Sequence, residues 1–163
     1  PVAANLRRIA STVKINLDLE RMGDLACNIA QRARDLNAFP TFPIPDLIPS
    51  MARKSARMVR ESIDAFIHSD VRLARHVIHS DQSVDEDNRR IIAGLRSMMQ
   101  ADSSLIEPAL HCFSASRHFE RLGDHAENIA EDVVYFVDGE IVRHKHGNFA
   151  LLTDLRVENG TNR

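Results

Sequence analysis

Two stretches of the chain carry the same row of oxygen-bearing side chains. Residues 120–131 read ERLGDHAENIAE and residues 20–31 read ERMGDLACNIAQ, so Glu, Arg, Gly, Asp, Ala, Asn, Ile and Ala recur in the same order. Positions four residues apart on a helix fall within about 40° of one another, so the acids of each stretch share one face. The stripe of the second stretch consists of Glu120, Asp124, Glu127, Asn128 and Glu131. The corresponding residues of the first stretch are Glu20, Asp24 and Asn28.

Carboxylates one helical turn apart favour metal binding. Like charges at this spacing repel by about 0.2–0.5 kcal/mol per pair, and a bound cation relieves that repulsion. Oxygen ligands suit hard divalent ions, and Zn²⁺ and iron also accept them. The alternative is a solvated acidic face that binds nothing. Duplication favours a function, and so do Gly23 and Gly123, because Gly inside a helix costs about 1 kcal/mol relative to Ala and marks a close approach to the backbone.

The segment HSDQSVDEDNRR adds a second set of acids. Asp81 keeps helical register with the apolar residue Val77, and Asp85 follows one turn later. A carboxylate at the margin of an apolar stripe needs a partner. That partner is either a metal ion or an arginine such as Arg117 or Arg121, and both apply if the arginine braces a metal ligand.

Histidine and cysteine are assigned no role in this site. Three histidines recur every seven residues at the border of the apolar arc, away from the acidic stripe, which is typical of helix-edge groups; two more lie near the C-terminus. These residues are His111, His118, His125, His144 and His146. Cys27 and Cys112 form no CxxC pair, which favours reduced cytosolic thiols.

Composition narrows the class of protein. A net charge of -2 with three lysines gives no basic field for nucleic acid. No apolar run reaches the length of a membrane span, and no signal peptide is recognisable, so a soluble cytoplasmic protein is expected. The chain starts at Pro1 without an initiator Met, which fits a processed product or a fragment.

The positions of apolar residues and prolines predict the elements that carry these acids. Apolar spacings of three and four predict long helices over residues 2–35, 49–68, 71–100 and 105–138. Four prolines between Asn37 and Ser50 predict an extended connector. Ser69 and Asp70 predict a turn and a helix cap. No strand competes, so the sequence predicts an all-α, up-and-down bundle of long helices.

The repeated E-R-[ILM]-G-D-x-A-x-N-I-A signature resembles the PhoU family of regulators of bacterial phosphate uptake. The resemblance includes the proline-containing connector, residues 81–88 and VVYFVDGEIVRH, and so covers most of residues 1–145. It implies two three-helix repeats, each with the motif in its third helix. The expected units are the last helix of an incomplete first repeat (1–36), a connector (37–50), a complete second repeat (51–140) and a polar tail (141–163).

The resemblance implies multinuclear metal clusters on the bundle surface, with iron, zinc, manganese and magnesium as candidate ions. Carried over by position, the ligands of the second repeat are Glu120, Asp124 and Asn128, with Asp81 and Asp85 on the preceding helix. Glu127 joins them from its place on the stripe. The resemblance implies Glu20, Asp24 and Asn28 as the metal ligands of the first copy. That copy lacks the carboxylates that two missing helices would contribute, unless another chain supplies them.

The resemblance also implies a function. The expected protein is a non-enzymatic adaptor that links the ATPase of the phosphate ABC transporter to a sensor histidine kinase and represses the phosphate-starvation response. It would be cytoplasmic, and peripheral to the inner membrane through the transporter. Self-association into a homodimer or a larger assembly is expected because the apolar residues of the first helix have lost two natural neighbours. These residues are Ile9, Val13, Met22, Ile29 and Ala33.

Two other classes of protein compete with this interpretation. A ferritin-like dimetal bundle needs Glu-x-x-His on facing helices, and no Glu of this chain has His three residues later. The other is a structural or interaction bundle whose acidic face only keeps it soluble or pairs with a basic partner. Metal analysis separates the adaptor from the structural bundle.

Overall fold

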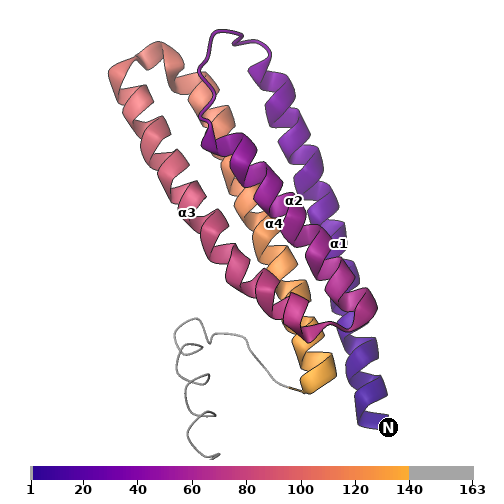
Figure 1. Ribbon diagram of the computed structural model, residues 1–163. Helices are drawn as coiled ribbons and strands as arrows, with labels where there is room; N and C mark the ends of the chain where they lie inside the picture. The colour runs from indigo at the N-terminus through magenta and orange to yellow at the C-terminus, as the bar shows by residue number, and fades with distance from the viewer. Residues whose placement is uncertain (1, 140–163) are drawn as a thin grey trace, which may run out of the picture.

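The structure of the chain, a computed structural model, describes residues 2–139, with side chains from residue 5 onward. It contains the helices α1 (Val2–Leu36), α2 (Leu47–His68), α3 (Val71–Ala101) and α4 (Ile106–Asp138), and a short 3-10 helix, η1 (Ser103–Leu105). Successive long helices run in opposite directions along one axis (Figure 1), which confirms the all-α bundle. The predicted polar tail (141–163), with His144 and His146, lies outside the described residues. In the part of the chain described here, no helix is long and apolar enough to cross a membrane.

The helix ends follow local sequence signals. The largest difference from the prediction is at α2, which begins at Leu47 rather than Pro49. Ser69 ends α2 in the left-handed region with φ 54°. The carboxylate of Asp70 then accepts hydrogen bonds from the backbone N–H groups of Arg72 and Leu73, at 2.9 and 3.0 Å. The predicted turn and cap are therefore confirmed.

Helix α4 is the centre of the bundle. It packs against α1, α2 and α3, and α2 and α3 also pack against each other. Among the described helices α1 contacts α4 alone, and it lies on the side of α4 away from α3 (Figure 1). The core between α2, α3 and α4 is built from fully buried side chains: Met51, Met58, Val77, Val84, Ile91, Leu95, Ile129 and Val133.

Helix α1 has two apolar faces instead of the single stripe that its periodicity suggests. Ile15, Met22 and Leu25 are buried against the bundle. The second face is 57 to 66% exposed and consists of Leu6, Ile9, Val13 and Leu17. The sequence placed Ile9, Val13 and Met22 together, but nine residues at about 100° each put Val13 and Met22 on opposite sides of a helix. Helix α4 covers the Met22 side, and no other described helix covers the Ile9 side.

Candidate metal centre

Three carboxylates meet where α3 packs on α4. Asp81 and Asp85 come from α3, and Asp124 comes from α4. One oxygen of each lies within 4.8 Å of the others. All three belong to the ligand set expected from the sequence, and oxygens this close can bind a single cation together.

Gly123 allows α3 to approach α4 at this point. A Cβ atom on Gly123 would lie 3.0 Å from Asp81 Oδ1, 3.6 Å from Val84 Cγ1 and 3.7 Å from Met58 Cε. The absence of a side chain therefore leaves space for the Asp81 carboxylate, whereas the distances to Val84 and Met58 are ordinary van der Waals contacts. This close approach is what the glycine within the helix predicted.

Asp81 is the buried member of the group. Asp81 is 8% exposed, and its Oδ1 has no hydrogen-bond partner among the described residues. Burial, together with the neighbouring acids Asp85, Asp124 and Glu120, raises the pKa of Asp81 to about 7. The arginine partner that the sequence left open for Asp81 is not found there, because Arg117 bonds to Glu120 with an Nη1–Oε1 distance of 2.6 Å. A buried carboxylate oxygen that accepts no hydrogen bond is suited to interact with a cation.

The acids of the stripe surround this group. Burial, together with Asp81 and Glu131, raises the pKa of Glu127 to about 8. Burial also raises the pKa values of Glu120 and Asp124 above their usual range, although Arg117 lowers both. A cation would stabilise the ionised form of these groups. The structure places the stripe at the margin of the α3–α4 contact.

Two further polar residues of this region are one that the sequence predicted as a ligand and one that it did not single out. Asn128 lies one turn after Asp124 on α4 and is half-buried. Asp87, which the sequence did not single out, is buried and pairs with Lys54 of α2 at 2.6 Å. This ion pair ties α2 to the turn of α3 that carries Asp85. The sequence alone does not show which of the acids in residues 85–88 (DEDN) pairs with a lysine of another helix.

The first motif copy is not assembled in the same way. Glu20 and Asp24 are exposed, Asn28 is half-buried, and a Cβ on Gly23 would meet nothing within 4 Å. The alanines of the two copies show the same contrast. Ala126 and Ala130 of α4 are fully buried, whereas Ala26 and Ala30 of α1 are exposed. The described residues bring no second helix to this face of α1.

The heptad-spaced histidines lie at the contact between α1 and α4. His125 Nδ1 lies 2.7 Å from Asp18 Oδ1, and His111 Nδ1 lies 3.3 Å from Arg32 Nη1. His118 bonds to Ser114 on its own helix. Lys14 and Asp132 form a further ion pair across the same contact at 3.3 Å. These groups join α1 to α4, and none belongs to the group of three carboxylates.

Comparisons of the chain with a family model and with known proteins agree on one family. The family model described as "PhoU domain" matches residues 1–33 and 48–133. The phosphate-specific transport system accessory protein PhoU homolog of Pseudomonas aeruginosa is 39% identical over 145 residues, and the match covers 88% of this chain and 60% of that protein. The corresponding homolog of Xylella fastidiosa strain Temecula1 is 34% identical over 140 residues, or 86% of this chain and 58% of that protein. The chain thus spans about three fifths of the length of these curated relatives.

Solved structures are similar in fold over the same region. The crystal structure of PhoU from Pseudomonas aeruginosa superimposes with a TM-score of 0.83 at 37% identity, covering 86% of this chain and 68% of that chain. The phosphate transport system regulatory protein PhoU from Streptococcus pneumoniae gives a TM-score of 0.78 at 26% identity, over 85% of this chain and 66% of that chain.

Proposed function

Because the chain belongs to the PhoU family, we propose that it is a non-enzymatic regulator of phosphate uptake whose second repeat binds a divalent metal ion. One observation carries the metal proposal. The Asp81 carboxylate has a buried oxygen without a hydrogen-bond partner, and it faces Asp85 and Asp124 within 4.8 Å. A cation held by these three carboxylates would supply the missing partner and offset their mutual repulsion.

The proposed ligands are the three aspartates, with Glu120 and Glu127 as additional oxygen donors at the rim. Oxygen donors without sulfur or a converging histidine suit magnesium, manganese and iron, and zinc also accepts such a set. Metal binding would lower the raised pKa values of these acids and release protons. The metal would thereby brace α3 against α4.

The proposed partners follow from the family. The relatives are named as accessory proteins of the phosphate-specific transport system. For this chain we propose docking on the ATPase of the phosphate ABC transporter and on a sensor histidine kinase, with repression of the phosphate-starvation response when phosphate is plentiful. This role requires a cytoplasmic location, and the exposed apolar face of α1 supports a homodimer. The alternative is a structural bundle that binds no metal.

Thermal unfolding after chelation tests the metal proposal. Adding Mn²⁺, Fe²⁺ or Zn²⁺ to the metal-free protein should raise Tm, because a ligand that binds only the folded state stabilises it. The double variant Glu120→Ala and Asp124→Ala should lose this rise. The matched control is Glu20→Ala with Asp24→Ala, which changes the same motif positions where no second helix is near, and it should keep the rise. An unchanged metal response in the first double variant would contradict the proposed site.

A further inference from the structure

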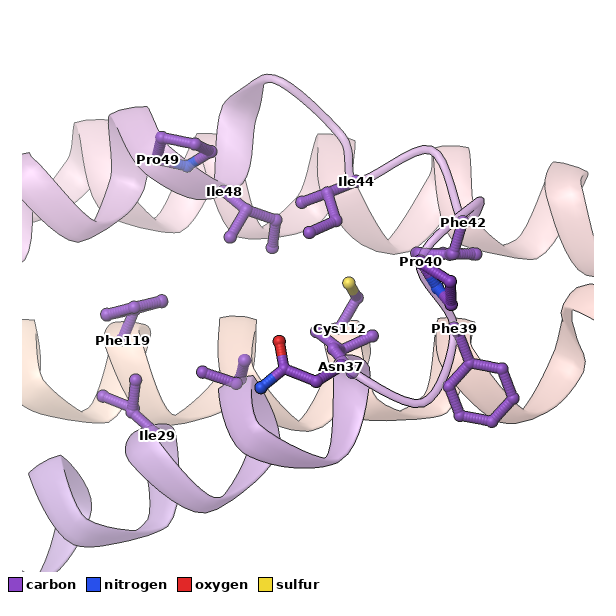
Figure 2. Close-up of a pocket in the computed structure, with 13 residues that line it drawn as sticks. Ile29, Asn37, Phe39, Pro40, Phe42, Ile44, Ile48, Pro49, Cys112 and Phe119 are labelled. Atoms are coloured by element: carbon purple, nitrogen blue, oxygen red, sulfur yellow. The ribbon is translucent and has the colours of Figure 1, made fainter.

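A cavity of about 450 Å³ lies at one end of the bundle, away from the three aspartates. Its walls are the last turns of α1, the connector (residues 37–46) and the first turns of α2 and α4 (Figure 2). Cys112 and Phe119 contribute from α4, and Phe39, Phe42 and Ile44 contribute from the connector. The cavity is open to solvent on one side.

The lining of this cavity is uncharged. Thirteen residues line it, and apart from the amide of Asn37 and the thiol of Cys112 their side chains are apolar. An ion entering it would lose hydration without gaining a counter-charge or a set of ligands. Metal ions and phosphate are therefore unsuited to it. Binding sites for small organic molecules, in contrast, typically have volumes of about 300–1,000 Å³ and apolar walls with a few polar groups.

The cavity follows from how the helices pack. Both α1 and α2 pack on α4 but not on each other, which leaves a channel along α4. Small residues such as Ala33 and Ala115 do not fill this channel. Prolines keep the connector from continuing as a helix, so it crosses the channel as a roof. Phe42, which is buried, and Phe39, whose ring centroid is 6.2 Å from that of His111, hold this roof in place.

Cys112 forms part of the wall. The residue is 1% exposed, and its sulfur points from α4 toward the connector (Figure 2). Burial raises the pKa of the Cys112 thiol to about 11, so the thiol is protonated and a poor nucleophile at neutral pH. Cys112 is thus a wall residue that a bound ligand would contact. A ligand in the cavity would slow the alkylation of its thiol, so the rate of alkylation reports whether the cavity is filled.

We propose that this cavity binds an uncharged, mainly hydrocarbon small molecule, with the amide of Asn37 at the exposed edge as its hydrogen-bonding partner. Such a ligand would contact α1, the connector, α2 and α4 at once. Its atoms would make van der Waals contacts with lining side chains that have no neighbouring atoms on the cavity side. This site is independent of the proposed metal function, because its lining includes none of the acidic stripe.

The neutral fluorescent hydrophobe N-phenyl-1-naphthylamine is a suitable probe, used with a chelator present so that metal binding plays no part. The wild-type protein should bind one probe per chain. Ala33→Phe should weaken binding roughly tenfold or more, because the new ring occupies the cavity. Ala30→Phe is the matched control: both alanines are exposed on α1, and only Ala33 lines the cavity. Ala30→Phe should bind the probe like the wild type.

Alkylation of Cys112 gives a second readout in a Cys27→Ser background, since Cys27 is exposed and would react first. Bound probe should slow the modification of Cys112 by N-ethylmaleimide. If Ala33→Phe loses helical content by circular dichroism, Ala115→Leu fills the same cavity from α4 and should give the same loss of affinity. Equal probe affinity in the folded cavity variants and the wild type, or unprotected Cys112 at probe saturation, would overturn the proposal.

Discussion

The Oδ1 atom of Asp81 on α3 lies 3.0 Å from the position that a Cβ atom would take on Gly123 of α4. A separation this short leaves no room for a side chain at residue 123 unless the Asp81 carboxylate moves. The equivalent glycine of the first motif copy, Gly23, has no such neighbour within 4 Å. The two glycines therefore share a sequence context and differ in structural role, which makes them a matched pair for mutation.

Gly23→Ala should stabilise the protein by about 0.5–1 kcal/mol, because Ala is the better helix former and has free space there. Gly123→Ala should show no comparable gain, because the same preference is offset by displacement of Asp81. Urea unfolding in chelator measures both effects. The apparent metal affinity, from Tm against metal concentration, should fall at least about tenfold in Gly123→Ala alone. A full metal response in that variant would show that Asp81 is not a ligand.

The metal-free protein should lose stability as pH rises. The pKa of Asp81 is raised from 3.8 to about 7 and that of Glu127 from 4.5 to about 8, so between pH 4 and 8 the folded state holds more protons than the unfolded state. The free energy of unfolding then falls with pH, by at most about 1.4 kcal/mol per pH unit for each group. Urea unfolding in chelator from pH 4.5 to 8.5 measures this slope.

Asp81→Asn should flatten this pH dependence, because the amide does not titrate. Asp64→Asn, at an exposed position of α2, is the control and should keep the wild-type slope. Added metal should act in the opposite direction and stabilise more at high pH, since deprotonated carboxylates bind it. A wild-type protein whose metal-free stability rises steadily from pH 4.5 to 8.5 is incompatible with the raised pKa values.

The exposed apolar face of α1 should drive self-association at micromolar concentration. Ile9→Lys with Val13→Lys places two charges on that face and should weaken association at least tenfold. Ile67→Lys is the control, since Ile67 is an equally exposed apolar residue at the C-terminal end of α2 and is not part of the α1 face. Sedimentation velocity across the concentration range measures the effect. A compact wild-type monomer throughout would argue against the dimer.

The acidic stripe should be needed for regulation. Asp124→Asn with Glu127→Gln removes two ionisable carboxyl groups and keeps side-chain size, so the fold should survive. A full-length version with these changes, in a cell without its own copy, should fail to repress phosphate-starvation genes in rich phosphate, because charge governs metal binding and partner encounter. Glu20→Gln with Asp24→Asn serves as the control, measured with the same reporter. Normal repression by the folded, abundant Asp124 and Glu127 variant would place the signalling surface elsewhere.

The sequence determined the helices and the rows of acids because both depend on local spacing. Apolar residues three and four apart predicted each helix to within two residues, and the prolines of the connector ended the first one. The register of Glu120, Asp124 and Glu127 follows from 3.6 residues per turn and needs no tertiary contact. Gly23 and Gly123 carried the same local signal of a close approach, and among the described residues the prediction is confirmed at Gly123 and wrong at Gly23.

Which acids meet was decided only by the packing of α3 on α4. Asp81, Asp85 and Asp124 converge, and Asp87 pairs with Lys54 of α2, because these outcomes depend on the axial register of separate helices. The corresponding motif of α1 stays open because no second described helix covers it. A hydrophobic pattern records that a face is apolar and does not record what lies against it. Which face of α1 is covered, and the cavity under the connector, are therefore decided only by the tertiary structure.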